Sequence, residues 1–175
     1  MTLQLKRTPG LYLVGFMASG KTTVGRAVAA QLGWEFVDID SEVEAREGQS
    51  IANIFRERGE EAFRELEANA VRRYVTRIER GLPHVVALGG GAAVQPRNWD
   101  LIACNGVTVW LDCPLATVHR RLGDHTTRPL AADREKLKQL FETRRALYAR
   151  AHYRVDADCD DVPTIVKRVV NLPIF

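Results

Sequence analysis

The most constraining feature of this sequence is an eight-residue pattern near its start, Gly15-Phe-Met-Ala-Ser-Gly20-Lys21-Thr22. It fits the pattern G-x-x-x-x-G-K followed by Ser or Thr in full, and it lies between an apolar run that ends at Val14 and an amphipathic stretch that begins near Thr22. Glycines allow successive backbone N–H groups to turn towards an anion, and the following helix directs its positive end at the same point. The pattern therefore predicts a strand, a phosphate-binding loop and a helix.

Two side chains of this loop carry the chemistry of a nucleoside triphosphate site. Lys21 adds a full charge near the β- and γ-phosphates, and the Thr22 hydroxyl is a suitable ligand for Mg²⁺. Such loops serve kinases, GTPases, ATPases and motor domains, so the loop alone does not select one class. The Asn-Lys-x-Asp motif of a GTPase is missing from the sequence, and the short chain of 175 residues favours a small-molecule kinase.

Five apolar runs rich in β-branched residues alternate with helical stretches. None alternates strictly between apolar and polar residues, so each is expected to be a strand covered on both faces. Strands that alternate with helices predict a parallel sheet with right-handed crossovers in a three-layer α/β fold. The expected strands are 11–14, 36–39, 85–88, 107–111 and 153–155, and the expected helices are 22–32, 41–47, 51–58, 60–79, 115–121, 133–150 and 163–170.

Length, charge and cysteine content narrow the possible classes of protein. A chain of 175 residues suits one domain, residues 1–175, with one core. The net charge of +3 is too small to indicate a nucleic-acid partner, and no apolar run approaches the roughly 20 residues needed to cross a membrane.

Three widely spaced cysteines predict neither a zinc site nor a disulfide framework. Their odd number, without a signal peptide, favours the cytoplasm.

Residues at the ends of two expected strands are candidates for binding the acceptor, because parallel sheets bind ligands beyond the carboxyl ends of their strands. The second strand is expected to end in Asp38-Ile39-Asp40, with both carboxylates on one side and about 7 Å apart. One carboxylate suits the Mg²⁺ shell and the other an alcohol, whereas a helix cap or simple solvation is the alternative. The third strand runs into Gly89-Gly90-Gly91, which lets a substrate lie against the backbone if it is not merely a flexible turn.

A third candidate lies between these strands, in the expected helix that contains Phe63-Arg64-Glu65-Leu66-Glu67. Arg64 and Glu67 are three residues apart and share a helix face. In a binding site, Arg64 would hold a carboxylate through two hydrogen bonds while Glu67 orients it. An ordinary surface salt bridge has the same spacing, and spacing alone favours that interpretation.

Taken together, these motifs resemble those of shikimate kinase. Their order and rough spacing hold from about Leu11 to Val170. The resemblance implies a five-stranded parallel sheet of order 2-3-1-4-5 flanked by helices. It also implies transfer of the γ-phosphoryl group of ATP to the 3-hydroxyl of shikimate, with Mg²⁺, on the pathway to chorismate and aromatic amino acids, by a monomer. The motifs that carry it are Gly15-x4-Gly20-Lys21-Thr22, Asp38-Ile39-Asp40, Phe63-Arg64-x-x-Glu67, Gly89-Gly90-Gly91 and Arg128-Pro129-Leu130.

The resemblance further implies a role for each motif residue. Asp40 would bind the acceptor hydroxyl, and Asp38 would support Mg²⁺ together with Thr22. Arg128, in a lid of about residues 123–132, would close over the phosphates, so the implied catalytic residues are Lys21, Asp40 and Arg128. Arg121 and Pro163 would lie on either side of adenine. The implied nucleotide-binding residues are Ala18, Ser19, Gly20, Lys21, Thr22, Thr23, Arg121, Arg128 and Pro163.

The implied shikimate site extends from a region of about residues 41–70 into the second half of the chain. The family pattern Arg-x-Pro-Leu-Tyr corresponds to Arg144-Arg145-Ala146-Leu147-Tyr148, with Ala146 in place of proline. Tyr148 sets the register, so Arg144 is the implied carboxylate ligand and Arg145 a bystander. The lid is also short for the family, which bears on how it closes. The implied shikimate-binding residues are Asp40, Arg64, Gly89, Gly90, Gly91 and Arg144.

Two other functions share these motifs. A small-molecule kinase of the same fold that phosphorylates gluconate would also bind a carboxylate. A non-catalytic ligand-sensing module, as found in some transcription regulators, would carry an N-terminal helix-turn-helix domain and would lack catalytic residues. The short stretch before the first strand leaves no room for that domain, and Lys21, Asp40, Arg64 and Arg128 are all present. The sequence therefore favours the shikimate kinase interpretation.

Overall fold

The computed structural model describes residues 10–123 and 134–174, and within them five strands form one parallel sheet. This arrangement confirms the predicted parallel sheet and its order. The strands are β1 (Gly10–Val14), β2 (Glu35–Asp38), β3 (His84–Ala87), β4 (Gly106–Asp112) and β5 (Tyr153–Asp156), in the order β2-β3-β1-β4-β5.

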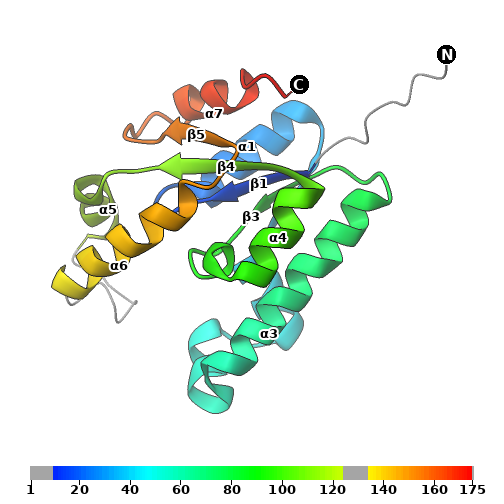
Figure 1. Ribbon diagram of the computed structural model, residues 1–175, viewed down its shortest axis with the longest axis vertical. Helices are drawn as coiled ribbons and strands as arrows, with labels where there is room; N and C mark the ends of the chain where they lie inside the picture. The colour runs from blue at the N-terminus through cyan, green and yellow to red at the C-terminus, as the bar shows by residue number, and fades with distance from the viewer. Residues whose placement is uncertain (1–9, 124–133, 175) are drawn as a thin grey trace.

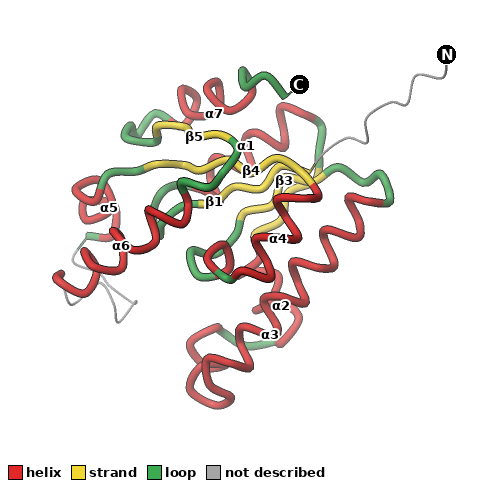
Figure 2. The backbone as a smooth tube through the Cα atoms, in the orientation of Figure 1, coloured by secondary structure: helices red, strands yellow, loops and turns green. Residues whose placement is uncertain are grey.

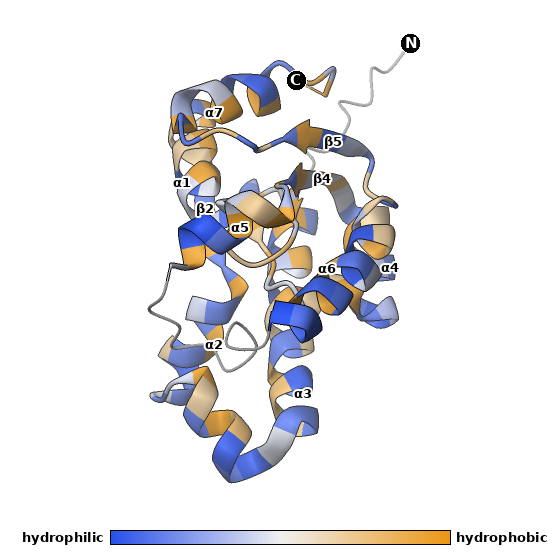
Figure 3. Cartoon of the chain, turned by 90° about the vertical axis from the view of Figure 1, so that its left-hand side faces the viewer, coloured by the Kyte–Doolittle hydropathy of each residue, from blue (hydrophilic) through white to orange (hydrophobic). Residues whose placement is uncertain are grey.

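Helices cover both faces of the sheet and make the three layers expected of alternating strands and helices (Figure 1 and Figure 2). Helices α1 (Lys21–Leu32) and α7 (Val162–Val170) lie on one face, and α3 (Ile51–Glu79) and α4 (Pro96–Asn105) lie on the other (Figure 3). None of the helices in residues 10–123 and 134–174 is long and apolar enough to span a membrane. The remaining helices are α2 (Ile39–Glu47), α5 (Leu115–Leu122), α6 (Arg134–Tyr148) and the 3₁₀ helix η1 (Ala92–Val94).

The centre of the sheet is covered on both faces, as its apolar runs predict. Every residue of β1 and β3 is buried. Leu11 pairs with Val85 on one side and with Val107 on the other, so β1 lies between β3 and β4. This position puts the loop that follows Val14 in the middle of the edge formed by the carboxyl ends of the strands.

The end of the second strand differs from the prediction. Strand β2 ends at Asp38 and helix α2 begins at Ile39, so Asp40 lies in the first turn of the helix and not on the strand. The reason is local: Asp38 Oδ1 accepts hydrogen bonds from the backbone N–H groups of Asp40 and Ser41, which makes it the N-cap of α2. The predicted alternation of the two carboxylates along a strand is therefore wrong.

Two other elements show where sequence patterns succeed and fail. The two helices expected at 51–58 and 60–79 form α3, and Gly59 between them has the non-helical angles φ 82° and ψ 172° that separate its two segments. Helix α4 was not predicted. It is short and rich in poor helix formers, and apart from the buried Asn98 its buried face consists of Trp99 and Ile102. The expected lid, 123–132, lies outside the described residues from 124 onward.

Candidate active site

The phosphate loop bends tightly between β1 and α1. Gly15 has φ 147°, and a Cβ there would lie 2.7 Å from the carbonyl oxygen of Leu111 in β4. Gly20, at the N-terminus of α1, has φ 93°, and Ala18 has φ 57°. Ala18 is the one residue other than glycine in the described chain with a positive φ. This backbone path turns the loop around a common centre at the positive end of α1.

The Lys21 ammonium lies over this loop. Its Nζ donates hydrogen bonds to the carbonyl oxygens of Gly15 at 2.9 Å and Phe16 at 2.8 Å. The Ser19 hydroxyl is 3.5 Å away, and the Ser19 side chain is fully buried. The charge of Lys21 is thus held at the mouth of the loop, where phosphate oxygens would replace carbonyl oxygens as its partners.

Thr22 and Asp38, the two residues expected to support Mg²⁺, are in direct contact. The Thr22 hydroxyl donates a hydrogen bond to Asp38 Oδ2 at 2.6 Å. Both groups are hard oxygen donors, and Mg²⁺ in nucleotide sites commonly takes one or two carboxylates together with substrate phosphates. The described residues hold no group of three or more His, Cys, Asp or Glu side chains that would bind a metal without a nucleotide. The pair therefore fits a metal that arrives with the triphosphate.

A cleft of about 410 Å³ joins the phosphate loop to the acceptor side. Of the loop residues predicted to bind nucleotide, all but Ser19 line it, and so do Asp38, Asp40, Gly89 and Gly90 from the acceptor side. Ser41 and Glu44 also line it, and sequence reasoning missed both. Glu44 follows Asp40 by four residues on α2, so the i, i+4 spacing on one helix face was the signal available. The cleft is bounded by Met17, Ala18, Gly20, Lys21, Thr22, Thr23, Asp38, Asp40, Ser41, Glu44, Ile51, Leu88, Gly89 and Gly90.

The glycine triplet that follows β3 packs directly against charged side chains. A Cβ on Gly89 would overlap the carboxylate of Asp40, and one on Gly91 would overlap the guanidinium of Arg64. A Cβ on Gly90 would lie 3.0 Å from Nη1 of Arg144. None of the three glycines has a positive φ, so these positions need glycine for space and not for backbone angle. The triplet thus brings Asp40, Arg64 and Arg144 to one edge of the sheet.

Arg64 pairs with a buried Glu67, so the ordinary surface salt bridge favoured by spacing alone is wrong. The Glu67 side chain is only 1% exposed, and both its carboxylate oxygens accept from Nη1 of Arg64, at 3.2 and 3.1 Å. Glu60 also accepts from Arg64 Nη2 at 3.1 Å. Two carboxylates thus hold the guanidinium in place beside Gly91.

The charge state of Glu67 depends on pH near neutrality. Burial raises the pKa of Glu67 to about 7, while Arg64 acts in the opposite direction and Asp40 adds to the rise. Since the folded pKa exceeds the ordinary value of 4.5, stability from this group is fully present below pH 4.5 and is lost as the pH rises through 7.

We expect Glu67→Gln to remove this pH dependence. Relative to the variant, the wild-type protein should lose up to about 3 kcal/mol of unfolding free energy between pH 4.5 and pH 7. Urea unfolding of both proteins at pH 5 and pH 8 measures the change. Glu65→Gln is the control, because Glu65 is an exposed neighbour whose pKa is lowered by its hydrogen bond from Arg97. The stability that Glu65 contributes is therefore lost as the pH falls, at pH values below those at which Glu67 acts. A difference between wild type and Glu67→Gln that is equal at both pH values would contradict the expectation.

The last turns of α6 bring Arg144 and Tyr148 to the glycine triplet. The Arg144 guanidinium lies 6.0 Å from the centre of the Phe16 ring in the phosphate loop. The Tyr148 hydroxyl donates to the carbonyl of Gly90 at 2.8 Å, and burial raises the pKa of Tyr148 to about 12. Sequence reasoning used Tyr148 only to set the register, whereas its neutral hydroxyl fixes the triplet to α6.

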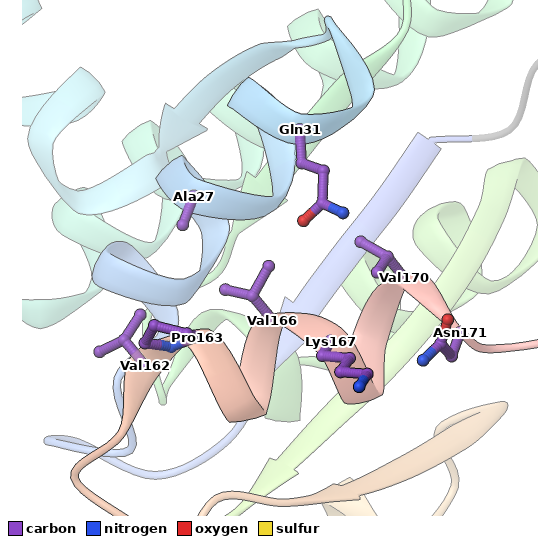
Figure 4. A pocket seen from close by; sticks show the side chains of 8 residues that line it. All are labelled: Ala27, Gln31, Val162, Pro163, Val166, Lys167, Val170 and Asn171. Carbon is purple, nitrogen blue, oxygen red and sulfur yellow. The ribbon is translucent and has the colours of Figure 1, made fainter.

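Arg121 and Pro163, expected to lie on either side of adenine, border different hollows. Arg121 lines a hollow of about 330 Å³ beside the phosphate loop, where it donates to the carbonyl oxygens of Ala18 at 3.1 Å and Cys159 at 2.7 Å. Pro163 lines a groove of about 560 Å³ between α1 and α7 (Figure 4). Val162 lines both hollows, but Arg121 and Pro163 do not line the same one. Arg128 lies outside the described residues.

Comparison with known proteins identifies the family. The family model described as shikimate kinase matches residues 17–172. A shikimate kinase of Persephonella marina is 42% identical over 162 residues, covering 92% of this chain and 96% of that protein. One of a Sulfurihydrogenibium species is 44% identical over 162 residues, covering 92% and 95%.

Solved structures agree with this assignment. The structure described as shikimate kinase from Acinetobacter baumannii in complex with shikimate has a TM-score of 0.85 and 34% identity, covering 94% of this chain and 92% of that one. The shikimate kinase of Aquifex aeolicus has a TM-score of 0.78 and 34% identity, covering 91% and 92%. A sugar kinase from a Janibacter species, with a TM-score of 0.66 at 20% identity, shares the fold alone. The chain therefore belongs to the shikimate kinase family.

Proposed function

We propose that this chain transfers the γ-phosphoryl group of ATP to the 3-hydroxyl of shikimate, giving shikimate 3-phosphate. One observation carries the proposal: three consecutive glycines after β3 each contact a different charged side chain, and these are Asp40, Arg64 and Arg144. A hydroxyl-binding carboxylate and two guanidinium groups thus converge next to the phosphate loop. This set suits an acceptor that is both an alcohol and a carboxylate.

On the donor side, residues 18–23 bind the phosphates of ATP, and Lys21 neutralises charge on the β- and γ-phosphates. Thr22 and Asp38 would hold Mg²⁺, which would supply further charge neutralisation. Arg121 contacts the nucleotide beside the loop, and Pro163 lines the adjoining groove, which shares Val162 with the hollow at Arg121. Arg128 closes over the phosphates, an assignment that rests on the family resemblance.

On the acceptor side, Arg64 and Arg144 bind the carboxylate of shikimate, and the ring lies against Gly89, Gly90 and Gly91. Two guanidinium groups on one carboxylate fix the ring and aim its hydroxyl at the donor, which removes most of the orientational freedom that opposes transfer. Asp40 accepts a hydrogen bond from the reacting hydroxyl. Phosphoryl transfer passes through a loose transition state, so the main task of Asp40 is to orient the hydroxyl.

A coupled ATP-consumption assay tests the proposal. The protein with ATP and Mg²⁺ should release ADP rapidly when shikimate is added, and only slowly without an acceptor or with gluconate. Turnover with gluconate in place of shikimate would support the gluconate-type kinase. Tight shikimate binding without turnover would support a ligand-sensing module. We also propose that the protein is a monomer, and light scattering under assay conditions tests this.

We expect Gly91→Ala to weaken acceptor binding selectively. The backbone of Gly91, with φ −83° and ψ −32°, accepts alanine without strain, so the only consequence is that the new Cβ displaces the guanidinium of Arg64. The KM for shikimate should rise about tenfold while the KM for ATP changes little. Steady-state kinetics with each substrate varied in turn measures both values.

Gly81→Ala is the matched control. Gly81 has φ 86°, and apart from its two chain neighbours no residue lies within 4 Å of the position that a Cβ would take, so alanine strains the backbone without touching the site. It should lower the melting temperature and leave both KM values unchanged. An equal rise in the KM for shikimate in both variants would mean that the effect of Gly91→Ala is one of stability.

A further inference from the structure

Asp112, which has no part in the proposed chemistry, is a buried carboxylate that pairs with two partly exposed arginines from different elements. It is the last residue of β4, and its side chain is 6% exposed. Its Oδ2 accepts a hydrogen bond from Nη2 of Arg145, on α6, at 2.8 Å. Nη2 of Arg154, on β5, lies 2.6 Å from the same oxygen. The carboxylate therefore fixes both α6 and β5 to the end of β4.

The indole of Trp110 restrains the same two guanidinium groups. Trp110 is buried on β4, and the guanidinium carbons of Arg145 and Arg154 lie 5.4 and 5.3 Å from its ring centre. These are cation–π distances. Arg145 is thus held by a charge and by a ring, which leaves it little rotational freedom.

Arg145 is the neighbour of Arg144 on α6, and the two point to different sides of the helix. The buried residues of α6 are Leu137, Phe141 and Tyr148. Successive residues of a helix point about 100° apart, so Arg144 and Arg145 lie on opposite sides of the line from Phe141 to Tyr148. Arg144 extends to Gly90 and Phe16, and Arg145 extends to Asp112. A rotation of α6 about its own axis would therefore move both arginines together.

We propose that Arg145 and Asp112 are positioning residues: their ion pair sets the rotation of α6 about its axis and thereby aims Arg144 at the carboxylate of the acceptor. The inference rests on the proposed function, in which Arg144 binds that carboxylate. Arg145 and Asp112 line a separate hollow of about 10 Å³ together with Phe16 and Tyr148, which is too small for either substrate, so both act through Arg144 and not on the substrates.

Arg145→Met tests the inference without unfolding the protein, because Asp112 keeps Arg154 as its partner. The KM for shikimate should rise about tenfold, with kcat and the KM for ATP nearly unchanged. Arg145→Lys should recover part of the loss, since an ammonium group still pairs with Asp112. Arg154→Met is the matched control. It removes the other arginine that contacts Asp112 and Trp110, but that arginine lies on β5, so the contact between α6 and Asp112 remains. It should leave the KM for shikimate unchanged.

Two further measurements separate positioning from a general loss of structure. In an Arg144→Ala background, Arg145→Met should cause no additional rise in the KM for shikimate, because the residue it positions is gone. A crystal structure of Arg145→Met should show the guanidinium of Arg144 displaced from Gly90, a result that requires no turnover. Turnover of the wild-type protein tests the proposed function, whereas the position of Arg144 in the variant structure tests this inference. An unmoved Arg144, an equal effect of Arg154→Met, or a full effect in the Arg144→Ala background would overturn it.

Discussion

Replacing Lys21 with methionine is expected to lower kcat about 1,000-fold, because the proposed role of its ammonium group is to neutralise charge on the transferring phosphoryl group. The ammonium is held by two carbonyl oxygens of the phosphate loop, those of Gly15 and Phe16, so it is already placed before nucleotide binds. Methionine keeps the length of the side chain and much of its apolar stem. Steady-state kinetics at saturating ATP, Mg²⁺ and shikimate measures the loss.

Lys138→Met is the control for this variant, since it removes one positive charge from an exposed position on α6. It should turn over at the wild-type rate. A melting temperature of Lys21→Met close to that of wild type would show that the loop still folds. Residual kcat within tenfold of wild type would mean that the phosphate loop is not where transfer occurs.

Sequence patterns predicted the sheet well because its strands are short, apolar and separated by longer polar stretches. All five strands lie within two residues of the predicted ranges, and the break at Gly59 lies where the helices were separated. The elements missed were η1 and α4, because η1 has only three residues and α4 has only ten, among them the poor helix formers Asn98, Asp100 and Asn105. The start of α2 was misplaced because the pattern Asp38-Ile39-Asp40 suits a strand end and a helix cap equally well, and the cap is decided by hydrogen bonds.

The sequence names the residues of the candidate site, but it does not reveal their burial or their contacts. Spacing placed Arg64 and Glu67 on one helix face, but spacing cannot tell whether that face is buried. The 1% exposure of Glu67 follows from the packing of α3 beside the glycine triplet, a contact between residues far apart in sequence. Likewise, the sequence does not reveal the ion pair of Arg145, because its partner Asp112 lies 33 residues away on β4.

Replacing Arg64 with methionine is expected to have the second large effect, and only the KM for shikimate should change. The KM for shikimate should rise about 100-fold, because a charge-assisted, two-point contact with a carboxylate is lost. The KM for ATP should remain near its wild-type value, since Arg64 lies against Gly91 and does not line the cleft that contains the phosphate loop. Kinetics with each substrate varied at saturation of the other measures both values.

The burial of Glu67 determines how this experiment must be controlled. Removing Arg64 leaves Glu67 buried without its main partner, which is costly and drives the carboxylate towards its protonated form. The double variant Arg64→Met, Glu67→Gln removes the uncompensated charge, so it should regain stability without regaining shikimate affinity. Arg72→Met, at an exposed position on the same helix, should change neither KM. If the KM for shikimate and the KM for ATP rise equally in the double variant, Arg64 is not a ligand of the acceptor, because the stability effect has by then been removed.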